Sequence, residues 1–333
     1  MMLRDEVLTI LKSQEDYLSG SEISRRLGVT RMAVSNAVKA LRADGYEIDA
    51  VTNRGYRLQK SVDQLSPGEI YAHLPAARRE TVRCFAQIDS TNSYLKREAV
   101  AGAPNGLCAV ANEQTAGRGR SGRSFFSAAD CGVYLSILLR PYCPPENAMT
   151  LTAHTAVAMC RAIRRACGAE AGIKWTNDIV LNARKLCGIL TEITLEAETG
   201  LIDSVVIGIG VNVNYTPEDF PPELRDVAGS IFSETGVKAD RAKLAAEIIL
   251  ALDEMSEAWS RDPKAYLEDY RALCVTTGKE VRVLRGDAAR NAFALEITDD
   301  FALRVRYEDG TEENLNSGEV SVRGLFGYQA FHP

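Results

Sequence analysis

Apolar residues recur at helical spacing three times in the first part of the chain, over residues 3–13, 19–28 and 31–45. The short turn GVT joins the second and third segments, which is the spacing of a helix-turn-helix. Residues 46–58 then alternate apolar and polar side chains on both sides of the letters NRG, a pattern typical of a hairpin. Three helices followed by a hairpin predict a winged helix-turn-helix over residues 1–62.

The charge of this segment favours a contact with nucleic acid. Residues 21–60 carry eight basic and four acidic side chains, a net charge of +4, whereas the whole chain has a net charge of -6. Polar and basic side chains away from the apolar stripe of the third helix can donate hydrogen bonds in a major groove. The candidate DNA-binding residues are Arg25, Arg26, Arg31, Ser35, Asn36, Lys39 and Arg54. The alternative is a module that docks onto another protein.

Strand-like and helix-like segments mix along the central part of the chain. Apolar runs predict strands at 105–114, 132–140, 187–196 and 203–215, and amphipathic patterns predict helices at 150–168 and 241–260. Residues 277–333 alternate apolar and polar side chains between turns, which predicts roughly five short strands in a small barrel. The predicted fold is therefore α+β and multidomain: a winged helix-turn-helix at 1–62, a mixed α/β domain at 63–275 and a small β-barrel at 276–333.

Composition narrows the cellular setting. Hydrophobic residues make up 46% and charged residues 25% of the chain, as in ordinary soluble globular proteins. The sequence has no apolar run of about 18 residues, and its N-terminus lacks the features of a signal peptide. The eight cysteines form no C-x-x-C pair and the three histidines lie far apart, so neither disulfides nor a protein-bound zinc are expected. We therefore expect a cytoplasmic protein that does not enter a membrane.

The stretch TAGRGRSGRS, residues 115–124, fits two phosphate-binding patterns. Gly117, Gly119 and Gly122 satisfy the dinucleotide fingerprint G-x-G-x-x-G, and the same stretch nearly satisfies the P-loop pattern. Both patterns place the phosphate at the N-terminus of a helix. Only about ten residues separate Gly122 from the next predicted strand, which is too few for the crossover helix. The stretch is therefore neither a nicotinamide site nor a P-loop.

Three arginines, Arg118, Arg120 and Arg123, lie in this stretch without an acidic side chain between them. We name residues 117–124 the arginine loop. Its glycines let the backbone approach a ligand closely. Because three like charges repel, we expect the loop to be mobile until an anion such as a triphosphate or an acyl phosphate orders it through charge-assisted hydrogen bonds. The alternative is a solvated basic surface loop.

Four blocks follow one another along the chain: DSTN at 89–92, QTAGRGRSGRSFFS at 114–127, KWTNDI to RKLCGIL at 174–190, and GIGVNVN at 208–214. In this order and spacing they resemble the biotin protein ligases. The winged helix-turn-helix before them and SGEVSVRG at 317–324 behind them extend the resemblance to the bifunctional form, ligase and biotin operon repressor in one. The resemblance covers nearly the whole chain.

The resemblance implies a fold, an activity and partners. It implies a class II synthetase-like sheet in the central domain and an SH3-like barrel at the C-terminus. The family uses biotin and ATP, with Mg²⁺, to form biotinyl-AMP, and then transfers biotin to one lysine of a biotin carboxyl carrier protein. Operator DNA, biotinyl-AMP as corepressor and a ligand-dependent homodimer are also implied. Two alternatives stay open: a lipoate-type ligase, and a repressor that senses biotin without modifying a protein.

The resemblance also assigns roles to single residues. Lys185, Arg120 and Asp178 are the candidate catalytic residues, with Lys185 between the biotin carboxylate and the α-phosphate and Asp178 orienting Lys185 or holding Mg²⁺. The candidate biotin-binding residues are Ser90, Thr91, Asn92, Gln114, Arg118, Gly119, Arg120 and Lys185. The candidate adenylate-binding residues are Gly117, Arg118, Arg120, Arg123, Asp178 and Asn212, and Mg²⁺ enters on the ATP phosphates rather than at a protein metal site. The alternative for Asn212 is a turn residue, and Trp175 fits core packing better than stacking on a ligand.

Two places depart from the family pattern. Thr176 stands where the family commonly has proline, and the chain has FFSA at 125–128 where the family commonly has Trp-Phe-Ser-Pro. Phe125 keeps the aromatic bulk but has no indole N–H, and Ala128 lacks the fixed turn of proline. Because neither change removes a charged group, we expect the activity to be retained.

Overall fold

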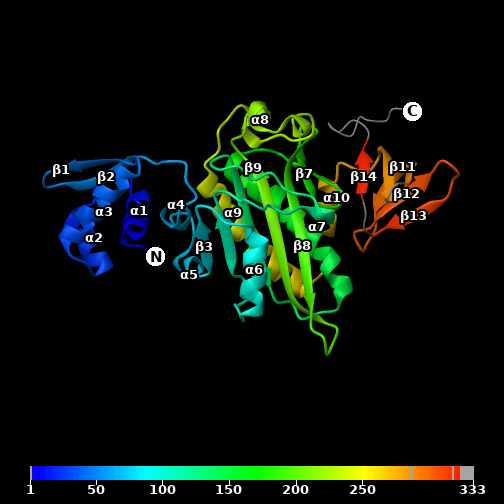
Figure 1. The fold of residues 1–333 in the computed structure, drawn as a ribbon, viewed down its shortest axis with the longest axis horizontal. Coiled ribbons are helices and arrows are strands. Elements are labelled where there is room, and N and C mark those ends of the chain that lie inside the picture. The colour runs from blue at the N-terminus through cyan, green and yellow to red at the C-terminus, as the bar shows by residue number, and fades with distance from the viewer. Residues whose placement is uncertain (1, 286–287, 317–318, 323–333) are drawn as a thin grey trace.

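The computed structural model describes residues 2–285, 288–316 and 319–322, which form three parts in a row (Figure 1). The first part is small and mostly helical, the second is built on a large sheet, and the third is a smaller sheet. Residues 317–318 and 323–333, which belong to the expected barrel and to the SGEVSVRG block, lie outside the described residues. In the part of the chain that is described, no helix is both long enough and apolar enough to cross a membrane.

The first part has the expected helix-turn-helix and a two-stranded wing. Its elements are α1 (Leu3–Lys12), α2 (Gly20–Leu27), α3 (Arg31–Ala43), β1 (Glu47–Val51) and β2 (Gly55–Lys60). Ser19 caps α2 by accepting a hydrogen bond from the backbone N–H of Glu22, and Thr30 caps α3 in the same way. Gly28 ends α2 with a left-handed φ of 65°, which favours glycine. The buried side chains of this part form a hydrophobic core of their own.

The central sheet has seven strands among the described residues, in the spatial order β3-β4-β5-β9-β8-β7-β6. β3 and β4 run parallel, and every other neighbouring pair runs antiparallel, so the sheet is mixed as expected. The strands are β3 (Val82–Phe85), β4 (Cys108–Ala111), β5 (Gly132–Leu139), β6 (Gly172–Lys174), β7 (Asp178–Leu181), β8 (Arg184–Leu195) and β9 (Ile202–Asn212). β8 and β9 form a long hairpin through the middle of the sheet.

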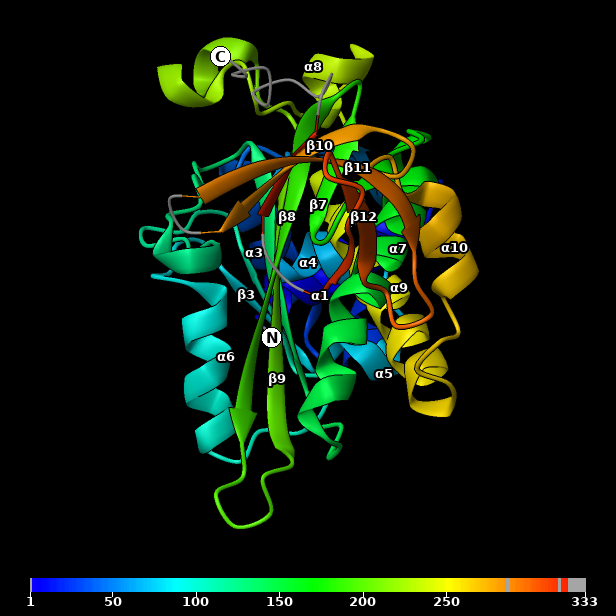
Figure 2. The same cartoon turned by 90° about the vertical axis from the view of Figure 1, so that its right-hand side faces the viewer.

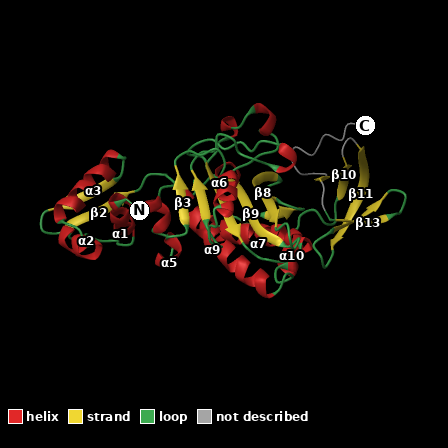
Figure 3. Cartoon of the chain, turned by 60° about the horizontal axis from the view of Figure 1, so that its bottom comes forward, coloured by secondary structure: helices red, strands yellow, loops and turns green. Residues whose placement is uncertain are grey.

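Helices cover both faces of this sheet (Figures 2 and 3). α7 and α9 pack against each other on one face, and α6 lies on the other. The helices of this part are α4 (Pro67–Tyr71), α5 (Ala76–Arg79), α6 (Thr91–Val100), α7 (Ala148–Cys167), α8 (Ile231–Thr235), α9 (Arg241–Arg261) and α10 (Leu267–Leu273). Because both faces are covered, β5 is buried along its whole length and reads as a nearly continuous apolar run rather than an alternating one.

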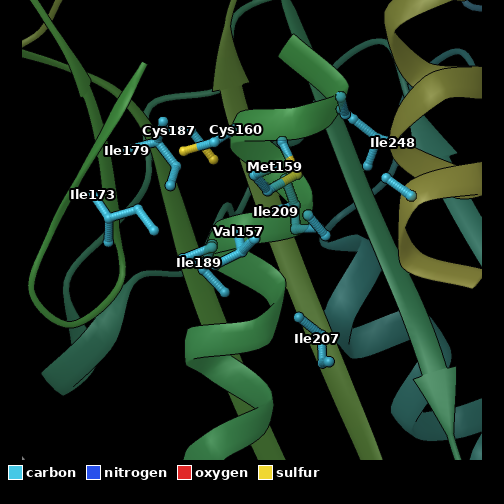
Figure 4. Close-up of a cluster of buried hydrophobic side chains, with 14 of the residues drawn as sticks. Val157, Met159, Cys160, Ile173, Ile179, Cys187, Ile189, Ile207, Ile209 and Ile248 are labelled. Atoms are coloured by element: carbon cyan, nitrogen blue, oxygen red, sulfur yellow. The ribbon is translucent and has the colours of Figure 1, made fainter. Parts of the chain in front are cut away.

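The main hydrophobic core lies between the sheet and α7 (Figure 4). Val157 of α7 lies close to Ile189 of β8, and Ile207 and Ile209 of β9 extend the same layer. These side chains are at most 3% exposed. Burial of each such side chain contributes about 1.5–3 kcal/mol to the free energy of unfolding. This layer keeps β8 and β9 in place beneath the candidate site on the opposite face of the sheet.

The third part is a five-stranded antiparallel sheet, as far as the described residues go, in the order β13-β12-β11-β10-β14. Its strands are β10 (Glu280–Arg285), β11 (Ala288–Ile297), β12 (Leu303–Tyr307), β13 (Glu312–Leu315) and β14 (Glu319–Val322). The indole N–H of Trp175, at the end of β6, donates to the backbone oxygen of Phe301 at 3.1 Å. Trp175 is 3% exposed, so it packs in the junction between the two sheets.

Two ion pairs with a buried partner fasten the first part to the central sheet. Lys12 of α1 pairs with the buried carboxylate of Glu69 in α4. Arg241, at the start of α9, is fully buried and donates to the side chain and the backbone oxygen of Asp63, both at 2.7 Å. The same guanidinium donates to Asn112 Oδ1 at 2.9 Å, just beyond β4. The segment that joins the two parts is therefore held against the central sheet.

We expect Ile207→Ala to lower the free energy of unfolding by about 3–4 kcal/mol, because it leaves a cavity in a closely packed core. Ile193→Ala on β8 is the matched control, since Ile193 is 43% exposed whereas Ile207 is 0% exposed. The control should cost less than about 1 kcal/mol. Urea unfolding of both variants measures the difference, and equal losses would contradict this placement of the core.

Candidate functional site

β6, β7 and β8 bring two lysines onto one carboxylate. Lys174 ends β6 and pairs across the turn with Asp178, the first residue of β7, while Lys185 is the second residue of β8. Lys185 Nζ lies 2.6 Å from Asp178 Oδ1, and Lys174 Nζ lies 3.6 Å from Asp178 Oδ2. The sequence pattern pointed to Asp178 and Lys185 but not to Lys174. Its one signal was its position at the start of the KWTNDI block.

Burial and charge act on Asp178 in opposite directions. Burial alone would raise the pKa of this carboxyl, but attraction to Lys185 and Lys174 and their hydrogen bonds outweigh burial and hold the pKa below its ordinary value. Asp178 therefore stays ionised at neutral pH between two cations. Because the folded-state pKa is lowered, the cluster stabilises the fold at pH values above the ordinary carboxyl pKa, and this stabilisation is lost as the pH falls through the lowered value.

The DSTN block forms the start of α6 and faces Gln114. Ser90 is the N-cap, and its hydroxyl accepts from the backbone N–H of Ser93. The backbone N–H and the hydroxyl of Thr91 donate to Gln114 Oε1 at 2.9 and 3.1 Å. Ser90, Thr91 and Asn92 are each no more than 4% exposed. The structure thus gathers hydroxyl and amide groups in one buried corner.

Two further polar residues complete this corner, and sequence reasoning missed both. Ser136 of β5 is fully buried, with its hydroxyl 2.7 Å from Thr91 Oγ1 and 2.5 Å from Asn92 Oδ1. Glu192 of β8 accepts a hydrogen bond from Asn92 Nδ2 at 3.0 Å. The lone hydroxyl in the apolar run VYLSILL was an available signal for Ser136. Nothing in the local pattern marks Glu192, because its partners lie far away in the chain.

The arginine loop is tied to both ends of the site. Arg118 Nη2 lies 3.5 Å from Glu192 Oε1. Arg120 Nη1 donates to Asn177 Oδ1 at 2.8 Å and to Thr176 Oγ1 at 3.2 Å. The loop contains a single 3-10 turn (Arg120–Gly122), and β5 is the next regular element. Neither nucleotide-binding pattern therefore has the helix that it needs.

Two glycines of the GIGVNVN block make room for side chains above β9. A Cβ atom at Gly208 would lie 2.2 Å from Asn92 Oδ1, and one at Gly210 would lie 2.3 Å from the ring of Phe125. Both separations are far below van der Waals contact, so these positions exclude any larger residue unless Asn92 or Phe125 moves. The block is glycine-rich because side chains from α6 and from the end of the arginine loop rest directly on the strand.

Most of these groups line one cavity of about 200 Å³, although Ser136, Glu192 and Thr176 are not among the described residues that line it. Asn212 and Gly117 are not among its lining residues in the described part of the chain. The Asn212 amide instead donates to the backbone oxygens of Gly229 at 3.0 Å and Lys185 at 3.4 Å, where it supports the start of β8. The residues expected from the sequence that do line the cavity are Ser90, Thr91, Asn92, Gln114, Arg118, Gly119, Arg120, Arg123, Asp178 and Lys185.

The candidate DNA-binding residues of α3 lie on its outer side. Arg31, Asn36 and Lys39 are exposed, and Ser35 is partly buried. The opposite side of α3 is buried in the core of the first part. The structure therefore exposes one arginine, one amide and one lysine of α3, groups that can contact an opposing major groove.

Three other candidates of the first part have acidic partners. Arg25 and Arg26 of α2 both pair with Glu22, the latter at 2.8 Å. Arg54, in the turn of the wing, lies over the ring of Tyr17 at 4.3 Å and pairs with an acidic neighbour at 3.3 Å. The charges of these three arginines are therefore partly balanced within the protein.

Comparison with known proteins relates two segments of the chain to known domains, and nearly the whole chain to two curated proteins. Residues 84–212 match the biotin/lipoate A/B protein ligase family, and residues 4–57 match a helix-turn-helix domain. The bifunctional ligase/repressor BirA of Bacillus subtilis is 36% identical over 96% of this chain and 98% of its own length. The bifunctional ligase/repressor BirA of Escherichia coli is 30% identical over 95% of this chain and 96% of its own length.

Solved structures agree with the sequence comparison. The biotin protein ligase from Aquifex aeolicus, in complex with biotin and ATP, matches with a TM-score of 0.62 at 26% identity, covering 73% of this chain and 98% of that one. The match with the two BirA proteins runs nearly from end to end, and it includes the helix-turn-helix, the central sheet and the cavity. The chain thus belongs to the family of bifunctional ligase/repressor BirA proteins.

Proposed function

We propose that the chain is an ATP-dependent biotin protein ligase that also represses the genes of biotin synthesis and transport. The proposal rests on the lining of one cavity, which combines hydroxyl and amide groups with arginines and lysines. The ureido group of biotin is neutral and has both donors and acceptors, which suits the hydroxyl and amide groups. A carboxylate and a phosphate suit the arginines and lysines, because cations bind both through charge-assisted hydrogen bonds.

In the first step a biotin carboxylate oxygen attacks the α-phosphorus of ATP, the bond to pyrophosphate breaks, and biotinyl-AMP forms. Lys185, oriented by its 2.6 Å contact with Asp178, neutralises the charge shared by carboxylate and phosphate. Arg118 and Arg120 hold the two anions together. Mg²⁺ arrives on the ATP phosphates, and these oxygens suit it better than Asp178, whose carboxylate is already shared by two lysines.

In the second step the amine of the carrier lysine attacks the acyl carbon of biotinyl-AMP. The amide bond forms, the amine loses a proton, and AMP leaves with the electrons of the anhydride bond. No nucleophile of the enzyme is needed, so the protein acts by positioning and by charge. The arginine loop, closed over the anhydride, keeps water away from it until the carrier arrives.

Repression follows from the helix-turn-helix and from pairing of two copies. Beyond Gly188, β8 pairs only with β9 among the described strands, because β7 begins opposite Gly188, at Asp178, and runs away from this part of β8. An open strand edge of this kind supports a homodimer in which two copies pair along β8. Biotinyl-AMP, by ordering the arginine loop, would favour the dimer and hence binding to a two-fold operator.

The same proposal covers domain boundaries and location. We infer domains at 1–62, 63–275 and 276–333, the last an SH3-like barrel; the separate core of the first part supports the first boundary. Antiparallel pairing of β10 with both β11 and β14 is compatible with a closed barrel. Among the described residues no cysteine forms a disulfide, which suits a reducing cytoplasm.

Pyrophosphate release by the full chain with biotin, ATP and Mg²⁺ tests the ligase proposal. We expect release that depends on biotin, followed by transfer of labelled biotin to a carrier domain. Release with lipoate in place of biotin would identify a lipoate-type ligase. Binding of biotin without any pyrophosphate release would identify a sensor, and either result would overturn the proposal.

We expect Lys185→Ala to slow adenylate formation by about 100-fold or more, because it removes the cation that meets the developing charge. Lys264→Ala, at an exposed lysine, is the matched control and should leave the rate unchanged. Single-turnover pyrophosphate release measures both. A first step at the parental rate would remove Lys185 from the mechanism.

We expect Arg31→Ala and Lys39→Ala each to weaken DNA binding and to lower its salt dependence by about one counterion. Glu22→Gln should strengthen binding, since it releases Arg25 and Arg26 from a carboxylate. Gel shifts with the protein's own promoter DNA at several salt concentrations measure the slopes, with Arg290→Ala on β11 as control. Unchanged slopes in all variants would instead favour a protein-docking module.

A further inference from the structure

Two buried tyrosines hold the backbone at Ala128, four residues beyond the C-terminal end of the arginine loop. Tyr134 of β5 and Tyr215, which follows β9, are 1% and 0% exposed. The backbone N–H of Ala128 donates to Tyr215 Oη at 3.0 Å, and Tyr134 Oη donates to Ala128 O at 2.8 Å. The two hydroxyls are hydrogen-bonded to each other. If Tyr215 donates to Tyr134, each donor is used once and the ring of hydrogen bonds closes on Ala128.

The contact with Tyr215 depends on the backbone N–H of Ala128. Proline has no N–H and could not make the contact with Tyr215, whereas alanine leaves the backbone freer. The ring of hydrogen bonds through Tyr215 and Tyr134 restrains the backbone at Ala128 instead. Both hydroxyls keep their protons at neutral pH, because burial raises the pKa of Tyr215 to about 12 and raises that of Tyr134 further.

Tyr215 also connects the end of the arginine loop to the segment 216–230. Its ring stacks on Phe220 with centroids 4.7 Å apart, and the ring of Phe126 lies 5.9 Å away. The backbone oxygen of Tyr215 accepts from Ser230 Oγ at 2.6 Å. Phe125, next to Phe126, lines the cavity. One side chain therefore contacts both the chain that leaves the loop and the chain that follows β9.

We propose that Tyr215 is a positioning residue whose hydroxyl, through the Ala128 N–H and Tyr134, fixes the end of the arginine loop so that the loop closes over the acyl adenylate in one arrangement. The inference rests on the proposed ligase function. Tyr215 touches no reacting atom. Loss of its hydroxyl therefore leaves the first chemical step intact and loosens the cover over its product.

Tyr215→Phe keeps the stacked ring and removes only the hydroxyl. We expect biotinyl-AMP to dissociate about 5–10-fold faster, since Ala128 N–H loses its acceptor, while single-turnover pyrophosphate release changes less than about twofold. Tyr134→Phe is the matched control and should have the smaller effect. Tyr215 Oη already lies 3.5 Å from Ala128 O and can donate to it when Tyr134 cannot.

Ala128→Pro tests whether the N–H of this residue is the group that matters. In the Ala128→Pro chain the donor is gone, so adding Tyr215→Phe should change the dissociation rate less than about twofold. If Tyr215→Phe raised the dissociation rate of biotinyl-AMP by the same factor in the parental chain and in the Ala128→Pro chain, the proposal would be overturned. So would a parental dissociation rate in Tyr215→Phe.

Trypsin cleavage at the arginines of the loop, measured on the ligand-free full chain, needs no ligase activity. We expect faster cleavage at these arginines in Tyr215→Phe than in the parental chain. In the Ala128→Pro chain, adding Tyr215→Phe should change the cleavage rate little. A lowered melting temperature without a selective rise in loop cleavage would assign the hydroxyl to general stability and would overturn the inference. Absence of pyrophosphate release in the parental chain would instead overturn the ligase proposal. The cleavage rates would still show whether the hydrogen bonds among Tyr215, Tyr134 and Ala128 restrain the loop.

Discussion

The contact of Asp178 with Lys185 and Lys174 is the constraint on which the site depends. A carboxyl buried alone would favour its neutral form, and the buried Lys174 and the half-buried Lys185 would repel each other without it. Together they fix three charges at the ends of three neighbouring strands. A cation is thereby in position before any phosphate arrives. Electrostatic catalysis gains most from such fixed groups, because nothing has to reorganise when charge develops.

The arginine loop is attached to the rest of the site at several points. Arg118 meets Glu192, and Arg120 meets Thr176. Thr176 and Ala128 both supply hydrogen-bonding groups at or near this loop: the hydroxyl of Thr176 accepts from Arg120, and the N–H of Ala128 donates to a buried tyrosine. Both residues therefore restrain the arginine loop or the chain that directly follows it.

The sequence predicted those features whose signals are local or motif-like. Caps, apolar periodicity and the order of four blocks indicated the helix-turn-helix, the mixed sheet and most of the lining of the cavity. Features that depend on distant strands were not accessible. Ser136 and Glu192 lie 44 and 100 residues from Asn92, which both contact, and no spacing marks them. Asn212 belongs to a motif, yet its amide supports Lys185 and Gly229 from outside the cavity lining.

Amide hydrogen exchange of residues 117–124 tests most directly whether the fixed cations and the loop enclose an acyl adenylate together. With saturating biotinyl-AMP, the account predicts exchange in these residues slowed by about tenfold or more relative to the ligand-free chain. AMP without the biotinyl group should have a much smaller effect. Unchanged exchange in the loop, with protection confined to other parts of the cavity, would contradict the account.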